Sequence, residues 1–250
     1  MATREMVGFD AVRIATDDLA RATRQYGLLL GCAPERAATD LVRFALARGT
    51  VELVPGTPGA QSLCFVSPDA ESASAIAAAR DARFGGLEVL VDPHRASSAG
   101  DAPGRAIPSA DLAPTPGGFL AVDHVVINTP DPARAIHLWR DTLGVRLALD
   151  REFPARGLRM LFFRSAGVTL EFVSAIGAAT AGDDVLNGVA YRVADVAAVR
   201  TRLLDAAFDV SPIRDGNKRG TLVATVRNGT EGVPTLLIQA LPADAAGASS

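Results

Sequence analysis

The chain has 250 residues, 48% of them hydrophobic, and a formal net charge of −3 at pH 7. This length and apolar content suit one large or two medium domains with a substantial hydrophobic core. No stripe of basic residues interleaved with aromatic ones is present, so we do not expect nucleic acid as a partner.

The first half of the chain alternates between strand-like and helix-like patterns. The predicted strands are Phe9–Thr16, Leu41–Leu46, Thr50–Val54, Ser62–Ser67 and Leu87–Val91, and the predicted helices are Leu19–Leu30 and an alanine-rich segment near Ala70–Arg83. Residues 95–118 are rich in Ala, Ser, Pro and Gly and have no sustained period, although Ala106–Leu112 could form a short edge strand. Their last part, Ala113–Gly118, is interpreted as an interdomain linker.

The second half shows the same order of elements more clearly. A strand over residues 122–128 precedes a helix that has Asp131 as its N-cap and Gly144 as its terminator. Further strands are predicted at Arg146–Asp150, Arg159–Arg164, Val168–Val173, Val189–Val193, Val210–Ile213, Thr221–Arg227 and Thr235–Ala240, with a helix at Val196–Ala207. We therefore predict domains at residues 1–112 and 119–242, a linker at 113–118 and a disordered tail at 243–250.

An internal repeat relates the two halves. Phe9–Gly31 aligns on Val122–Gly144 without a gap. Identical residues meet at Asp10, Val12, Ile14, Thr16, Asp18, Ala20, Arg21, Ala22, Leu30 and Gly31 of the first copy. The informative difference is His124, which aligns with Ala11. We expect the two copies to superpose element by element.

The cysteine pattern and the N-terminal residues bear on the compartment. Cys32 and Cys64 stand in separate apolar contexts without CxxC spacing, which is typical of a reduced intracellular protein rather than of a disulfide framework. The first residues lack an apolar signal core, and no run approaches the roughly 20 apolar residues needed to cross a bilayer. We expect a cytoplasmic protein without membrane contact.

Side-chain alternation sets a histidine and a carboxylate apart from the apolar residues of their strands. His124 and Asn128 share one face of the strand 122–128, and Thr169 and Glu171 share one face of a later strand. A carboxylate inside an apolar run must be ion-paired, metal-bound or protonated. His124 could be a metal ligand, a general base or a hydrogen-bonded pocket residue. Glu171 could line a functional site or form a structural ion pair.

These residues and their spacing resemble the vicinal oxygen chelate superfamily, which includes glyoxalase I, methylmalonyl-CoA epimerase, bleomycin-resistance proteins and extradiol dioxygenases. The matching segments are Asp123–Ile127, Leu143–Gly144, Val168–Phe172, Val189–Asp195 and Gly232–Ile238. The resemblance covers nearly all of residues 119–242 and is weaker over residues 7–112. It implies an α+β fold of tandem βαβββ units, with two domains whose curled mixed sheets form cups.

The resemblance also implies a divalent metal in the cup, bound by residues on the first and last strands of each unit. His124 and Glu171 match two of these positions, whereas Gly188 and Leu236 stand at the other two and cannot bind a metal. The C-terminal metal site is therefore expected to be incomplete. In the first half the matching residues are Ala11, Glu52 and Ser62, so we expect its cup to lack a metal.

Two functions are compatible with this pattern. The first is a small-molecule enzyme of the isomerase or lyase type, with His124 and Glu171 as catalytic residues and Asn128, Arg192 and Thr169 as substrate-binding residues. Arg192 could hold a substrate carboxylate or phosphate, or neutralise Glu171. The alternative is a metal-free binding protein of the bleomycin-resistance type that sequesters an antibiotic. The expected partner is a small molecule, and a homodimer is left open.

Overall fold

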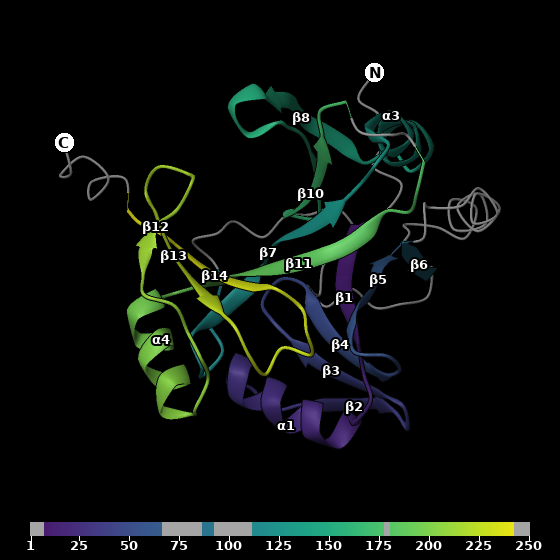
Figure 1. Ribbon diagram of the computed structural model, residues 1–250. Helices are drawn as coiled ribbons and strands as arrows, with labels where there is room; N and C mark the ends of the chain where they lie inside the picture. The colour runs from purple at the N-terminus through teal and green to yellow at the C-terminus, as the bar shows by residue number, and fades with distance from the viewer. Residues whose placement is uncertain (1–7, 67–86, 93–111, 178–180, 243–250) are drawn as a thin grey trace.

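The computed structural model describes residues 8–66, 87–92, 112–177 and 181–242 (Figure 1). The helix predicted near Ala70–Arg83, the tail predicted at 243–250 and all but the last residue of the possible edge strand Ala106–Leu112 lie outside these residues. Within the described ranges no helix has both the length and the apolar character required to cross a bilayer.

The first half forms a six-stranded mixed sheet in the order β2-β3-β4-β1-β5-β6. Its elements are β1 (Gly8–Thr16), α1 (Leu19–Leu30), β2 (Glu35–Ala38), β3 (Leu41–Ala45), β4 (Thr50–Pro55), β5 (Gly59–Val66) and β6 (Glu88–Asp92). Helix α1 begins after Asp18, whose carboxylate accepts a hydrogen bond from Arg21 N, and it ends at Gly31, which has a φ of 62°. Tyr26 and Leu29 share its buried face.

The second half forms an eight-stranded mixed sheet in the order β12-β13-β14-β11-β7-β10-β9-β8. Its elements are β7 (Phe119–Asn128), α3 (Pro132–Ile136), η2 (His137–Thr142), β8 (Arg146–Phe153), η3 (Pro154–Arg156), β9 (Leu158–Ser165), β10 (Val168–Ala175), β11 (Val185–Val193), α4 (Val196–Asp205), β12 (Arg214–Asp215), β13 (Thr221–Val226) and β14 (Thr235–Ala240). The central strands β7, β10 and β11 carry the residues on which the functional predictions rest.

The two sheets have the same strand order around their first strands. β1 pairs in parallel with β4 and antiparallel with β5. β7 likewise pairs in parallel with β10 and antiparallel with β11. The strands β3 and β2 then follow β4 as β9 and β8 follow β10. This confirms the α+β class and the common strand order that the internal repeat predicts.

Three local features differ from the predictions. The structure adds the exposed strand β2, whose alternation is too weak to detect. The strand predicted at Val210–Ile213 was wrong, because only Val210 forms a bridge, to Val226, and pairing resumes at the two-residue strand β12. The predicted helix after β7 becomes a π-helix from His137 onward, and Trp139 within it is fully buried.

A shared apolar core and a close backbone contact join the two halves. Phe65 of β5 packs against Trp139 of η2 with ring centroids 5.5 Å apart and the rings tilted by 53°. Gly117 approaches Gly31 so closely that a Cβ at Gly117 would lie 2.5 Å from the Gly31 Cα. In Figure 1 the helix α4 lies near one end of α1, and Arg202 of α4 donates hydrogen bonds to carbonyls at that end.

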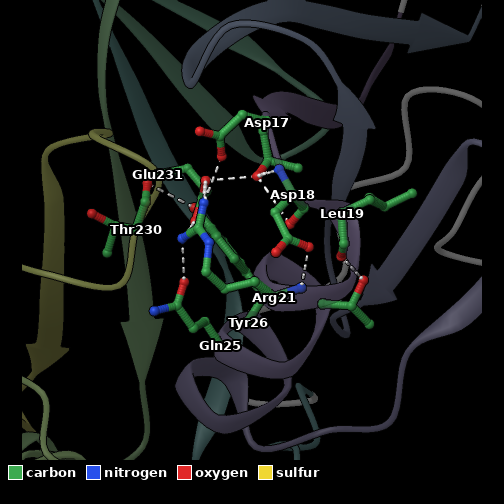
Figure 2. A network of polar contacts seen from close by, with 10 residues as sticks. Asp17, Asp18, Leu19, Arg21, Gln25, Tyr26, Thr230 and Glu231 are labelled. Carbon is green, nitrogen blue, oxygen red and sulfur yellow. Dashed lines mark hydrogen bonds and ion pairs between the residues drawn. The ribbon is translucent and has the colours of Figure 1, made fainter.

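A polar network also connects the halves, and Figure 2 shows it from close by. Glu231, which precedes β14, is buried and accepts hydrogen bonds from Arg21 of α1 and from the hydroxyl of Thr16 in β1. The buried Tyr26 hydroxyl donates to the carbonyl of Thr230 at 3.1 Å. We call Thr16, Arg21, Tyr26, Thr230 and Glu231 the interdomain network.

Candidate active site in the C-terminal sheet

The two faces of the C-terminal sheet differ in burial. One face of the central strands is fully buried in the core, as Val125, Leu170 and Phe172 illustrate. Residues that alternate with these, such as Val126 and Glu171, are only half-buried. The half-buried face is therefore the one that can receive a ligand, and we call it the open face.

The strand register arranges the open face in three rows across β9, β10 and β7, which we call rungs. The first rung is Arg164, Thr169 and His124; the second is Phe162, Glu171 and Val126; the third is Met160, Val173 and Asn128. Side chains that face each other across neighbouring strands lie on the same side of the sheet. His124 and Glu171 therefore share one face, as the alternation predicts, and they stand on adjacent rungs.

A β-bulge beside the first rung adds a residue that the sequence reasoning missed. Ala190 of β11 pairs with His124 and Tyr191 pairs with Val122, so Asp123 is an extra residue in β7. Its carboxylate Oδ2 lies 3.0 Å from His124 Nδ1. The sequence does mark this residue, because Asp123 is identical to Asp10 in the internal repeat. The structure shows a register shift at Asp10 of β1 as well.

Asp123 is held as an ionised carboxylate. Its Oδ1 accepts hydrogen bonds from Arg192 Nε at 3.0 Å and from Nη2 at 2.5 Å. Burial alone would raise the pKa of Asp123, but the hydrogen bond with His124 and the charge of Arg192 lower it to about 2. The predicted substrate-binding residue Arg192 is thus engaged by Asp123 rather than by Glu171.

The Asp123 carboxylate fixes the protonation pattern of His124. An ionised carboxylate only accepts hydrogen bonds, so His124 Nδ1 carries the proton in this contact and Nε2 is the nitrogen that gains or loses one. Burial would lower the pKa of His124, but the Asp123 hydrogen bond and the charges of Glu171 and Asp123 outweigh it and raise that pKa. His124 is therefore a base strengthened by a carboxylate.

Glu171 has the opposite character to Asp123. Within the part of the chain that the structure describes, its carboxylate forms no hydrogen bond or ion pair, and it is half-buried. Burial raises the pKa of Glu171, and the nearby charge of His124 opposes this without reversing it. The pair thus consists of a carboxyl group that tends to hold its proton and an imidazole that tends to gain one.

Thr169 and Asn128, the other two predicted substrate-binding residues, lie on different rungs. Thr169, only 4% exposed, accepts a hydrogen bond from Arg164 Nη1 at 2.5 Å. Asn128 is exposed on the third rung. Arg164 was not singled out from the sequence, because an arginine in a strand usually marks a solvated face.

A pocket of about 480 Å³ adjoins the third rung. It is lined by Asn128, Thr129, Pro130, Leu158, Val173, Ser174, Ala175, Ala181, Gly182 and Asp183. Arg134 of α3 secures one wall by donating to the Gly182 carbonyl at 3.0 Å and to the buried Asp184 carboxylate at 2.8 Å. The open face therefore has polar groups at one end and a mainly apolar pocket at the other.

The side chains around His124 do not suit a resident metal ion. Among the described residues, no group of three or more His, Cys, Asp and Glu side chains is arranged to hold one. Asp123 is committed to Arg192, and Gly188 and Leu236 offer no donor at the other two positions. In place of further metal ligands, the guanidinium groups of Arg164 and Arg192 flank the His124 region.

The equivalent carboxylate in the first half has a different environment. Glu52 is fully buried, and Arg13 and Arg43 donate hydrogen bonds to its two oxygens at 2.8 Å. The thiol of Cys64 lies 3.6 Å from the same carboxylate. Two arginines therefore neutralise Glu52, whereas Glu171 lacks such a partner in the described C-terminal residues.

Comparison with a family model identifies the C-terminal half. Residues 123–225 match the Glyoxalase/Bleomycin resistance protein/Dioxygenase superfamily, and the matched segment begins at the bulge residue Asp123. This match confirms, over residues 123–225, the predicted resemblance to the vicinal oxygen chelate proteins. No match to this chain is found among curated protein sequences.

Solved structures resemble the whole chain in fold. BphC, a halotolerant catechol dioxygenase, has a TM-score of 0.65 at 14% identity and covers 94% of this chain and 88% of its own. A mutant of 4-hydroxymandelate synthase from Streptomyces coelicolor has the same TM-score and identity, with 94% and 93% covered. Methylmalonyl-CoA epimerase from Mycobacterium tuberculosis aligns over 50% of this chain and 91% of its own, with 21% identity and a TM-score of 0.41.

Proposed function

We propose that this protein is a small-molecule enzyme that catalyses proton transfer on the open face of its C-terminal sheet. The supporting observation is the placement of His124 and Glu171 on adjacent rungs of one half-buried face. General acid–base catalysis is most efficient when the pKa of the group lies near the working pH. Burial raises the pKa of Glu171 toward that range, and Asp123 raises the pKa of His124.

Each residue has a defined part in this reaction. In its deprotonated form, as carboxylate or neutral imidazole, one group of the pair removes a proton from the substrate, and the other, in its protonated form, delivers a proton. Returning the proton to the same substrate skeleton gives an isomerisation, and protonating a departing group gives a lyase reaction. Asp123 orients the imidazole through Nδ1, and Arg164 places positive charge beside the first rung, where an oxyanion could develop.

The reaction as proposed uses no metal ion, because the described residues do not form a suitable ligand set. The purified protein should therefore contain less than stoichiometric divalent metal, and a chelator should not change its turnover. A stoichiometric metal that disappears in the His124→Ala variant would contradict the metal-free mechanism while leaving the location of the site intact.

The deciding experiment is a turnover screen with matched variants. Wild-type protein is incubated with small α-substituted acids and ketones in deuterated water, and proton exchange at carbon is followed by NMR. Glu171→Gln and His124→Asn should each reduce exchange by roughly two to four orders of magnitude, the usual contribution of a general acid or base. His137→Asn is the control, because that side chain is 79% exposed and lies on the helix η2.

The second candidate is a non-catalytic binding protein. The observation that favours it is the mainly apolar pocket beside a site in which two of the four family positions hold Gly188 and Leu236. A binding protein would show no exchange with any compound in the screen, and Glu171→Gln would then leave ligand affinity unchanged.

A further inference from the structure

We infer that Arg164 anchors the anionic head of the ligand, so that the substrate is a small acid with an apolar body. This inference rests on the proposed function, because it assigns the substrate class of the same site. It differs from the sequence-based expectation, in which Arg192 was the residue that could hold a substrate anion.

The first step concerns the availability of the guanidinium group. Arg164 is exposed, and in the described residues it has no carboxylate within ion-pairing distance. Arg192, by contrast, is bound to Asp123 through two of its nitrogens. A guanidinium group presents several donors in one plane and binds a carboxylate or phosphate in a bidentate manner, so Arg164 is suited to receive an anion.

The second step concerns how Arg164 is positioned. Its Nη1 donates to the hydroxyl of Thr169, which is buried in the sheet. This hydrogen bond holds one edge of the guanidinium group on the first rung, next to His124. Because this long side chain is already ordered before the ligand arrives, less side-chain conformational entropy is lost on binding.

The third step follows the rungs away from Arg164. Glu171 is on the second rung, so it faces the ligand atoms that follow the anionic head. Phe162 and Met160 provide half-buried apolar surface along the same path, which leads to the pocket beside Asn128. The first and third rungs are four residue steps apart along β10, from Thr169 to Val173, which is about 13 Å at the usual strand rise.

The charges and surfaces of the open face therefore specify a ligand with two ends. Its anionic group would bind Arg164, its reacting carbon would lie beside Glu171 and His124, and its apolar part would extend toward the pocket. A carboxylate and a phosphate share the chemistry of the head, and the test distinguishes them.

The test measures binding and needs no turnover. Octanoate, octyl phosphate and the neutral octanamide are titrated into the full-length protein by calorimetry, with wild type compared with Arg164→Gln. The better of the two anions should bind wild type roughly ten- to hundredfold more tightly than octanamide, the usual effect of a charge-assisted hydrogen bond. Arg164→Gln should lose that preference, and Arg164→Lys should retain part of it.

Arg159→Gln is the matched control, because it removes the same charge from the same strand, β9. The Arg159 side chain forms an ion pair with Asp150, and the residue lies opposite Ser174 in the sheet, away from the three rungs. It should bind both anions as wild type does. Equal binding of anions by wild type and Arg164→Gln, or no preference of wild type for an anion over octanamide, would overturn the inference.

Wild-type NMR provides a measurement that does not depend on a variant. Amide shifts caused by octanoate should concentrate on the residues of the three rungs, and shifts elsewhere alone would also overturn the inference. The outcome is separable from that of the proposed function. Arg164-dependent anion binding without any exchange activity would support the ligand class and reject the enzyme. Exchange activity that requires Glu171 and His124, in a protein whose anion binding does not depend on Arg164, would support the enzyme and reject the ligand class.

Discussion

At the scale of single residues, Asp123 determines the chemistry of the site. It is the carboxylate that ties Arg192 to His124, and its ionised form assigns the proton on the imidazole. Glu171 lies close enough to influence the same histidine, but in the described residues it has no hydrogen-bonding partner of its own. Under the proposed function the two carboxylates near this imidazole have separate tasks, since Asp123 orients the base and Glu171 exchanges protons.

The Asp123→Asn variant should reverse the direction of the His124 pKa shift. Burial is the largest influence on this group and lowers its pKa, and the contacts with Asp123 are needed to overcome it. With asparagine at position 123, the pKa of His124 should fall below its ordinary value of 6.5. An NMR titration of the His124 imidazole protons in wild type and in the variant checks this. An unchanged His124 titration would show that Asp123 does not control it.

The same carboxylate should make stability depend on pH in acid. The pKa of Asp123 falls from 3.8 to about 2 on folding, so its stabilising effect is complete above pH 3.8 and is lost as the pH falls through about 2. A shift of this size corresponds to about 2 kcal/mol. Urea unfolding should show Asp123→Asn to be less stable than wild type by about that amount at neutral pH, with the gap closing toward pH 2. A gap that does not change between pH 5 and pH 2 would contradict it.

Strand alternation predicted which residues of the candidate site share a face, but it did not predict the hydrogen bonds between them. The shared face of His124 and Glu171 follows from the two-residue period of strands, which the register confirms. Asp123 could not be placed in this way, because a β-bulge breaks the period at that residue. The role of Thr169 in holding Arg164 also depends on which strands are neighbours, and alternation within one strand does not contain that information.

At the scale of elements, local patterns predicted the strands and helices best where burial is strongest. The bounds predicted for α1 are those observed, because its cap, its apolar face and its glycine terminator agree. The π-helix η2 and the exposed strand β2 were missed for opposite reasons. The segment of η2 has the apolar spacing of an ordinary helix, which does not distinguish a π-helix from an α-helix, and β2 has no buried side chain to give it a pattern.

Two glycines near α1 should respond to alanine in opposite directions. A Cβ at Gly117 would lie 2.5 Å from the Gly31 Cα and 2.7 Å from the Leu30 oxygen, which are backbone atoms that cannot move aside easily. Gly117→Ala should therefore destabilise the fold by about 3 kcal/mol, the range of a severe steric mutation. A Cβ at Gly27, inside α1, would meet its nearest atoms at 3.8 Å and 3.9 Å.

The control variant Gly27→Ala should stabilise the protein by about 0.5 to 1 kcal/mol, because alanine lowers the entropy of the unfolded helix segment. Thermal melting of both variants beside wild type provides the measurement. If Gly117→Ala melted at the wild-type temperature, the close contact between the segment before β7 and the end of α1 would not be required for stability.

At the scale of the whole molecule, the repeat has kept residues while changing their partners. Arg21 and Arg134 are equivalent in the two copies, yet Arg21 reaches across to Glu231 whereas Arg134 secures the wall of the pocket through Asp184. The arginine at this position therefore contacts the other half in the first copy, whereas in the second copy it contacts a residue next to the pocket. We propose that the first half supports the C-terminal sheet and that the boundary between the domains lies at residues 113–118.

The interdomain network supplies the final prediction. Glu231 is buried with both oxygens hydrogen-bonded, so Glu231→Gln would leave Arg21 and Thr16 without their anionic partner. Because Arg21 is partly exposed and can be rehydrated, we expect a loss of about 1 to 3 kcal/mol, less than for a fully buried pair. Asp209→Asn, in the exposed pair with Arg227, should cost less than about 0.5 kcal/mol.

The form of the unfolding transition separates a local loss from a loss of coupling. The two halves share one apolar core, so wild type should unfold in a single calorimetric transition. If the interdomain network couples the halves, Glu231→Gln should broaden this transition or divide it into two, whereas Asp209→Asn should leave it single. A Glu231→Gln variant with wild-type stability and a wild-type transition would show that apolar contacts, such as that of Phe65 with Trp139, hold the halves together without the network.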